Sequence, residues 1–156
     1  MKAIEINGEI KKYSSIPNSF SVNGKYIAGG GKNLSEEKLK EFGFKDVVTP
    51  DIDYRIQELS EIKLVGDVYT YDVIEKEITQ TIEELKANKI EQLKSIIGGK
   101  LSTTDWYVIR NADVGVEIPA AIKEVRADLR DQSDILEAEI NALTTKKAVV
   151  LFDINL

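Results

Sequence analysis

Residues 81–101, TIEELKANKIEQLKSIIGGKL, decide the fold because apolar residues recur there at helical spacing among Glu, Lys and Gln. The apolar positions, starting just upstream, are Ile78, Ile82, Leu85, Ile90, Leu93 and Ile97. Side chains three or four residues apart share one face of a helix, so the spacing predicts a long amphipathic helix starting near Glu75. Adjacent glycines add no side-chain packing, so we expect Gly98-Gly99 to interrupt or kink the helix before it resumes over 100–112.

A second apolar stripe follows Pro119, a residue favoured at the first position of a helix. Its members, spaced near 3.5 residues and interrupted at Gln132 and Ser133, are Ile122, Val125, Leu129, Leu136, Ile140 and Leu143. A glycine-containing turn at Val114-Gly115 separates the stripes, so residues 75–145 are expected to form an antiparallel helical hairpin. Such a hairpin buries each helix on one face only and favours a third packing partner.

The end of the chain, residues 146–156, contains the hydrophobic run AVVLF at 148–152. This run predicts a strand, but too little chain follows it to form a sheet of its own. We therefore expect the segment to dock on this protein or on another chain. Val150 and Phe152 become candidate partner contacts on this interpretation.

Residues 1–74 predict a small module of short strands with one helix. Asn-Gly pairs tolerate positive φ at both residues and indicate hairpin turns at Asn7-Gly8 and Asn23-Gly24. A third turn is expected at Gly66-Asp67, between two further extended segments. Together with the hairpin that follows, the module predicts an α+β chain.

The one helix of this module is expected to start at Asn33, with Glu36 completing a capping box, and to stop at Gly43. Leu39 and Phe42 would form its buried face. The glycine run just before it, residues 29–31, predicts a flexible loop. A phosphate-binding loop is the alternative, but neither the Walker spacing nor the dinucleotide spacing is present.

Composition narrows the functional classes. A net charge of −6 disfavours nucleic acid as a partner, because polyanions repel each other. The chain has no Cys and no His, which removes disulfides, thiol catalysis, the commonest general base and the commonest metal ligand. We therefore expect no catalytic, cofactor or metal site. No apolar run approaches the length needed to span a membrane, which predicts a soluble intracellular protein.

The strongest functional signal is LSTTDWYVIR at residues 101–110, followed by Gly115, Ile118-Pro119 and VRADLR at 125–130. In order and spacing, these residues resemble the shared C-terminal signature of bacteriophage tail fibre assembly chaperones and related tail assembly proteins. GFKDVVTP at 43–50, preceding the Tyr69–Tyr71 segment, is similar to the N-terminal regions of such proteins. The helix beyond Leu129 and the apolar tail after Lys147 lie outside the resemblance.

The resemblance implies a role in tail morphogenesis, with a phage tail or tail fibre protein as partner. The place of action would be the host cell cytoplasm during assembly, or the virion tail. Three hypotheses remain open: a transient non-enzymatic chaperone or adaptor; a structural tail component held by helical and strand-addition contacts; and a coiled-coil homo-oligomer with no phage-specific task.

Two interpretations apply to the residues of the motif. Trp106 either buries against the final helix, on a turn capped by Thr104 or Asp105, or forms a partner surface with Tyr107 and Arg110. Arg126 and Arg130 are expected four residues apart on one helical face. Either Arg130 pairs with Asp134 at the surface, or both arginines bind an acidic client segment.

Overall fold

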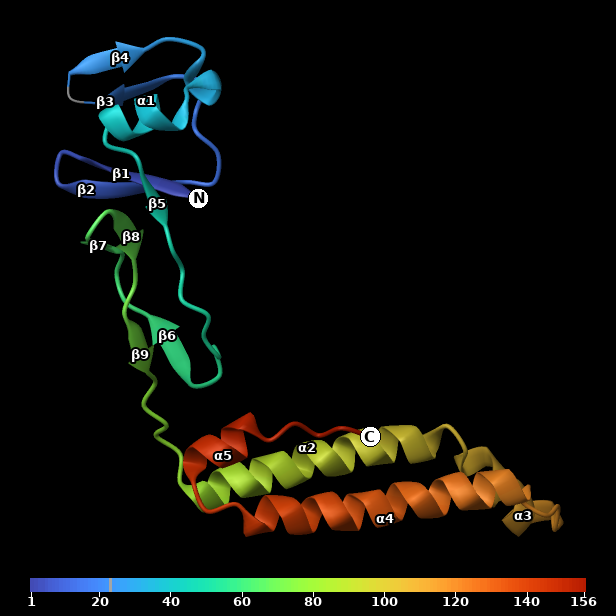
Figure 1. Ribbon diagram of the computed structural model, residues 1–156. Coiled ribbons are helices and arrows are strands. Elements are labelled where there is room, and N and C mark those ends of the chain that lie inside the picture. The colour runs from blue at the N-terminus through green and yellow to red at the C-terminus, as the bar shows by residue number, and fades with distance from the viewer. Residues whose placement is uncertain (23) are drawn as a thin grey trace. The chain divides into compact units, whose positions relative to one another are not determined.

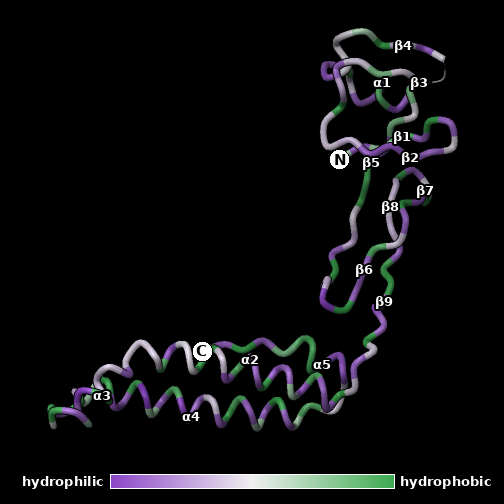
Figure 2. Tube along the Cα trace, turned by 180° about the vertical axis from the view of Figure 1, so that it is seen from behind, coloured by the Kyte–Doolittle hydropathy of each residue, from purple (hydrophilic) through white to green (hydrophobic). Residues whose placement is uncertain are grey.

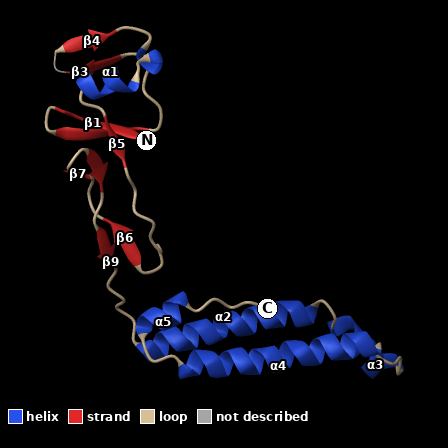
Figure 3. Ribbon diagram, viewed as in Figure 1, coloured by secondary structure: helices blue, strands red, loops and turns tan. Residues whose placement is uncertain are grey.

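The structure is a computed structural model that describes residues 1–22 and 24–156. The chain divides between Lys76 and Glu77 into two compact units, and each is described by itself. The sequence placed this boundary at 74/75. Strands fill the first unit and long helices fill the second, which confirms the predicted α+β class (Figure 3).

The N-terminal unit is built on a five-stranded sheet with the order β2-β1-β5-β8-β7. Two-stranded ribbons are formed by β3 with β4 and by β6 with β9. In the sheet, β5 and β8 are parallel, and every other neighbouring pair is antiparallel. The elements are β1 (Lys2–Ile6), β2 (Glu9–Tyr13), β3 (Phe20–Val22), β4 (Lys25–Ile27), the 3-10 turn η1 (Gly31–Asn33), α1 (Glu36–Glu41), β5 (Lys45–Val47), β6 (Gln57–Leu59), β7 (Lys63–Val65), β8 (Val68–Thr70) and β9 (Val73–Glu75).

The predicted hairpins are present. Asn7 and Gly8 have φ values of 55° and 82° and join β1 to β2 in a two-residue turn, as an Asn-Gly pair favours. Gly66 has a φ of 60° in the turn between β7 and β8. β3 and β4 pair as a hairpin too, although the first turn residue, Asn23, lies outside the described residues.

The start predicted for the short helix is wrong. Asn33 ends the 3-10 turn η1, and the extended Leu34 follows it, so α1 is capped instead by Ser35. The Ser35 Oγ accepts a hydrogen bond from the Lys38 backbone N–H. The helix stops as expected, because Gly43 adopts a φ of 94° immediately after it.

The backbone of the glycine run is hydrogen-bonded to the segment that precedes β3, and these contacts were not predicted. The backbone N–H groups of Gly30 and Gly31 donate to the side-chain and backbone oxygens of Asn18. A Cβ at Gly31 would lie 2.3 Å from the Pro17 carbonyl oxygen, so this position requires glycine. The run thus packs the loop against residues 17–19.

Aromatic side chains dominate the core of this unit. Phe20 and Phe44 meet edge to face, with ring centroids 5.2 Å apart, and both are buried. Phe42 and Tyr13 pack against the same pair at 5.7 and 5.9 Å. Leu39 of α1 completes the cluster, so the helix is held against the strands through its predicted apolar face.

The long helix begins later than the sequence indicated. The strands β6 and β9, at the two ends of the segment from Gln57 to Glu75, pair as a ribbon that was not predicted, and residues 76–80 are irregular. Thr81 then caps the helix in a complete capping box with Glu84. The backbone and hydroxyl groups of Thr81 donate to the Glu84 carboxylate and lower its pKa.

The C-terminal unit is an antiparallel helical hairpin with a third layer (Figure 1). Its helices are α2 (Ile82–Ser102), α3 (Asp105–Val114), α4 (Ala120–Ala142) and α5 (Lys146–Leu151). Figure 2 shows hydrophobic residues recurring along α2 and α4, which lie side by side. Leu93, Ile97 and Ile140 form the buried centre, as the stripes predicted. The expected interruption is wrong, because α2 continues through Gly98-Gly99.

The predicted C-terminal strand is also wrong. Thr145 caps the short helix α5, whose Val149 is fully buried, and the remaining residues continue along α2. Phe152 and Ile154 pack on the centre of the hairpin, and the Lys100 ammonium donates to the Leu156 carbonyl oxygen. The apolar run therefore supplies the third packing partner in cis. No helix among the described residues is both long and apolar enough to cross a bilayer.

Candidate partner-binding site at the end of the helical hairpin

Arg126 occupies an inward-facing position of α4. Partly or fully buried residues of this helix recur in alternating steps of four and three at Ile122, Arg126, Leu129, Ser133, Leu136 and Ile140, and the C-cap residue Leu143 continues this series; Glu137, beside Leu136, is half-buried as well. Val125, a member of the predicted stripe, is 51% exposed. The inward-facing series thus includes one charged residue, Arg126, and one polar residue, Ser133.

The Arg126 guanidinium joins three segments of the chain. Its Nη1 donates to the Leu101 carbonyl oxygen at 2.8 Å and to the Thr104 Oγ1 at 2.6 Å, and its Nη2 pairs with the Asp105 carboxylate at 2.9 Å. A buried cation is stable only with such partners. Arg126 therefore anchors α4 to the end of α2 and the start of α3, and this is contrary to the hypothesis that both arginines are available to bind an acidic client segment.

Arg130 lies one turn further along α4 and remains at the surface. Its Nη1 donates to the Arg126 carbonyl oxygen at 3.2 Å, and the expected pair with Asp134 is not found among the described residues. Within residues 1–22 and 24–156, no carboxylate forms an ion pair with this guanidinium. Its charge is left available to a partner.

None of the ten residues of α3, all of which the structure describes, is buried. Trp106 is 49% exposed, which is contrary to the interpretation that buries it against α4. Its ring lies on that of Tyr107 with centroids 3.7 Å apart. The exposed apolar residues of α3 and of the turn after it are Trp106, Val108, Ile109, Val114 and Val116.

The ends of α3 explain how an exposed helix is held. Thr104 is its N-cap residue, but the hydroxyl donates to Leu101 and accepts from Arg126 instead of capping. At the other end, Gly115 has a φ of 70° and the Asn111 side chain donates to the Val116 carbonyl oxygen. Both ends are fixed, while the long faces of α3 pack on little else.

A hollow of about 270 Å³ lies between α3 and α4. Val108 and Ile118 provide its apolar lining, and Lys123, Arg126 and Arg130 provide three cations. Lys123 also pairs with Glu117 at 3.0 Å, but both side chains are well exposed. The two arginines were predicted from the sequence, but Val108, Ile118 and Lys123 were not. These residues meet only because of the angle at which α3 follows the end of α2, and the sequence does not give this angle.

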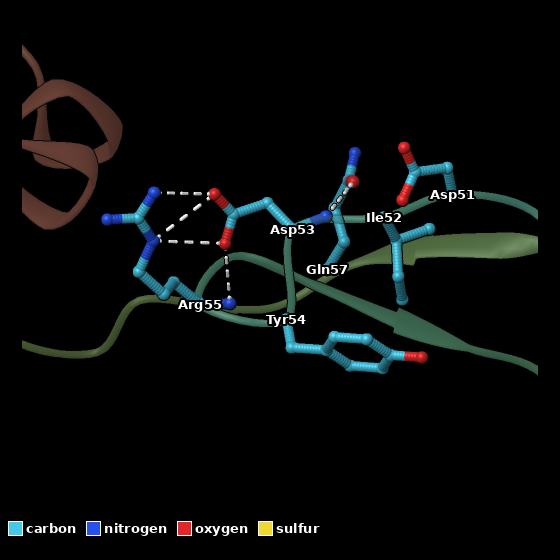
Figure 4. Close-up of a pocket in the computed structure, with 6 residues that line it drawn as sticks. All are labelled: Asp51, Ile52, Asp53, Tyr54, Arg55 and Gln57. Carbon is cyan, nitrogen blue, oxygen red and sulfur yellow. Dashed lines mark hydrogen bonds and ion pairs between the residues drawn. The ribbon is translucent and has the colours of Figure 1, made fainter.

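A larger depression of about 530 Å³ lies along residues 51–57 of the N-terminal unit (Figure 4). The Asp53 carboxylate accepts hydrogen bonds from the Arg55 guanidinium and backbone, and these lower the pKa of Asp53 to about 2. Figure 4 shows the Tyr54 ring directed away from this pair. The pair satisfies itself within one open loop, so it stabilises the loop and provides no acid or base near neutral pH.

The remaining predicted contacts lie elsewhere. Val150 is half-buried in α5, and Phe152 packs on the hairpin core, so neither joins the surface around α3. Tyr107 is half-buried and Arg110 is exposed, both on α3. Among the described residues, no group of three or more Asp and Glu side chains is arranged to hold a metal ion.

No family model, curated protein or solved structure matches this chain. The relation to tail fibre assembly proteins therefore stays a prediction from residues 101–130, 43–50 and 69–71 of the sequence.

Proposed function

We propose that this protein is a bacteriophage tail fibre assembly protein that acts as a non-enzymatic chaperone or adaptor for a tail or fibre protein. The resemblance supplies the biological setting. The observation that carries the molecular role is the exposure of α3, a helix with Trp106, Val108, Ile109 and Val114 at its surface. Aromatic and aliphatic side chains gathered on one exposed helix are typical of a partner-binding surface.

The arrangement of α3 supports transient client binding. Arg126 of α4 holds the start of α3 in place through its bonds to Leu101, Thr104 and Asp105. The apolar faces of α3 can therefore contact a client without unfolding of the hairpin. The rings of Trp106 and Tyr107 are in contact at this surface, with their planes tilted by 32° and Tyr107 half-buried. The protein would act in the host cell cytoplasm while its client folds or forms oligomers.

The alternative is a structural tail component that stays in the particle. Strand addition by residues 146–156 was one of its two proposed contacts, together with the long helices, and this segment instead packs in cis as α5 and the tail that follows. We therefore favour the chaperone. Mass spectrometry of purified particles separates the two: stoichiometric incorporation would contradict a transient role.

Co-expression with a candidate tail fibre protein tests the chaperone proposal. We expect soluble, trimeric fibre to form with the wild-type chain and to be strongly reduced with the double variant Trp106→Ser and Ile109→Ser. Both side chains are at least 49% exposed, so the variant should remain folded, which circular dichroism would check. Tyr54→Ser is the matched control, because Tyr54 is 66% exposed in the other unit. Equal fibre yields from all three proteins would contradict the proposal.

A further inference from the structure

We propose that the hollow between α3 and α4 binds a peptide segment of the client in which an acidic side chain neighbours an apolar one. The inference rests on the proposed function and names the chemistry that the partner presents to this surface. Its basis is the convergence of Arg130 and Lys123 on a hollow floored by Val108 and Ile118.

Charge complementarity sets the class of occupant. The chain carries a net charge of −6, yet each charged residue lining this hollow is a cation. Arg126 is already committed to Asp105, and Lys123 lies beside Glu117. Arg130 lines the hollow, and its guanidinium forms an ion pair with none of the described carboxylates. A client carboxylate there would gain a charge-assisted hydrogen bond, which the planar guanidinium can make in bidentate form.

The apolar part favours a peptide over a free anion. Val108 is 39% exposed and Ile118 is half-buried, so each retains surface that an apolar side chain can cover. Ile109 and Val116, which lie one and two residues from them in the chain, are exposed apolar residues as well. A volume of about 270 Å³ accommodates a side chain or two rather than a whole helix. The occupant is thus a short segment with its carboxylate directed at Arg130.

Fluorescence anisotropy with three labelled, end-blocked peptides of equal length tests the proposal. Each contains leucines alternating with one other residue, which is Glu, Gln or Lys. We expect the Glu peptide to bind the full chain most tightly and the Lys peptide to bind least. Arg130→Gln should weaken binding of the Glu peptide about tenfold, the effect of losing one hydrogen bond to a charged group. Val108→Asp should abolish it, because it adds a like charge to the apolar floor.

Lys89→Gln is the matched control, since it removes one positive charge from α2 outside the hollow. Equal weakening by Lys89→Gln and Arg130→Gln would indicate general charge attraction and overturn the proposal. So would equal affinity for all three peptides, or no binding. Concentration-dependent self-association lost in Arg130→Gln would assign the hollow to a second copy instead. Arg130→Gln could leave fibre assembly intact while the α3 double variant abolishes it. This result would support the chaperone function and contradict the binding of an acidic client segment in the hollow.

Discussion

The two arginines of α4, Arg126 and Arg130, lie one turn apart, but the first is buried and the second is exposed. Arg126 is buried among three partners from α2, the following turn and α3, whereas Arg130 lies exposed with one backbone contact. The difference follows from the register of the hairpin, in which position 126 faces α2 and position 130 faces outward. The same guanidinium group therefore stabilises the fold at position 126 and is available to bind a partner at position 130.

A second contrast separates the two units. The N-terminal core is a cluster of edge-to-face aromatic rings from short strands, whereas the C-terminal core is aliphatic and comes from three helices and the tail. Short strands contribute few inward positions each, so large rings are needed to fill the space. Long helices repeat an inward position every three or four residues, and aliphatic side chains are sufficient.

The largest expected effects come from core truncations that test the independence of the units. Phe44→Ala should cost the N-terminal unit about 3–5 kcal/mol, and Leu93→Ala should cost the C-terminal unit about 2–5 kcal/mol, because each leaves a cavity in a closed core. Hydrogen exchange measures both: the amides of β1 should lose protection in the first variant and those of α2 in the second. Loss of protection in both units from either change would show a single cooperative unit instead.

Arg126→Met sharpens the contrast between the arginines. The change should destabilise the C-terminal unit by about 2–3 kcal/mol, since it leaves the Thr104 hydroxyl and the Leu101 carbonyl without the cation that bonds them. Urea denaturation followed by fluorescence of Trp106, the single Trp of the chain, reports this unit. The matched change Arg130→Met should alter stability by less than about 0.5 kcal/mol. Similar losses in both variants would contradict the assigned register.

The two glycines inside α2 provide a smaller test. Gly98→Ala and Gly99→Ala should each stabilise the unit by about 0.5–1 kcal/mol, because a Cβ at either position meets no described atom within 4 Å. Thermal unfolding measures the gain. Gly115→Ala should do the opposite, since its φ of 70° disfavours any side chain. A destabilised Gly98→Ala would mean that the helix does break there, as the sequence first indicated.

The smallest effect concerns the exposed pair in the N-terminal unit. Because the folded state lowers the pKa of Asp53 to about 2, its stabilising contribution is complete above the usual carboxyl range and is lost as pH falls from about 4 towards 2. Carbon-detected NMR titration should show Asp53 titrating last among the aspartates. Arg55→Gln should return its midpoint towards 4. An unchanged midpoint would exclude Arg55 as the cause.

Much of the fold was available from local signals. The Asn7-Gly8 turn, the stop at Gly43 and the stripe from Ile82 to Ile97 were predicted, because each depends on residues close together in the chain. The β6–β9 ribbon was missed, since its strands are three residues long and pair across the β7–β8 hairpin. The helix caps at Ser35 and Thr81 were displaced from the predicted starts by extended or irregular residues before each one.

The candidate site was less predictable. Trp106, Tyr107, Arg110, Arg126 and Arg130 were identified from the sequence, but the choice between a buried and an exposed Trp106 stayed open, and the burial of Arg126 was not predicted. Apolar content alone placed Val125 inside, whereas the heptad spacing of Leu129, Leu136, Ile140 and Leu143 continues back to Arg126. Hydrophobic periodicity cannot predict that Arg126 is buried, because the partners that stabilise its charge lie 21 to 25 residues earlier in the chain.

The sequence by itself determined the α+β class, the hairpin of long helices and the turns, because periodicity and turn chemistry act over a few residues. Only the tertiary structure decided that residues 146–156 form a helix and a tail on α2, and that α3 is left outside the core. The apolar run AVVLF is short enough to adopt either conformation, and the uncovered face of the α2–α4 hairpin selects the one that buries it. In the same packing Arg126 is buried and bonds α4 to α2 and α3, whereas Arg130 and Trp106 remain at the surface.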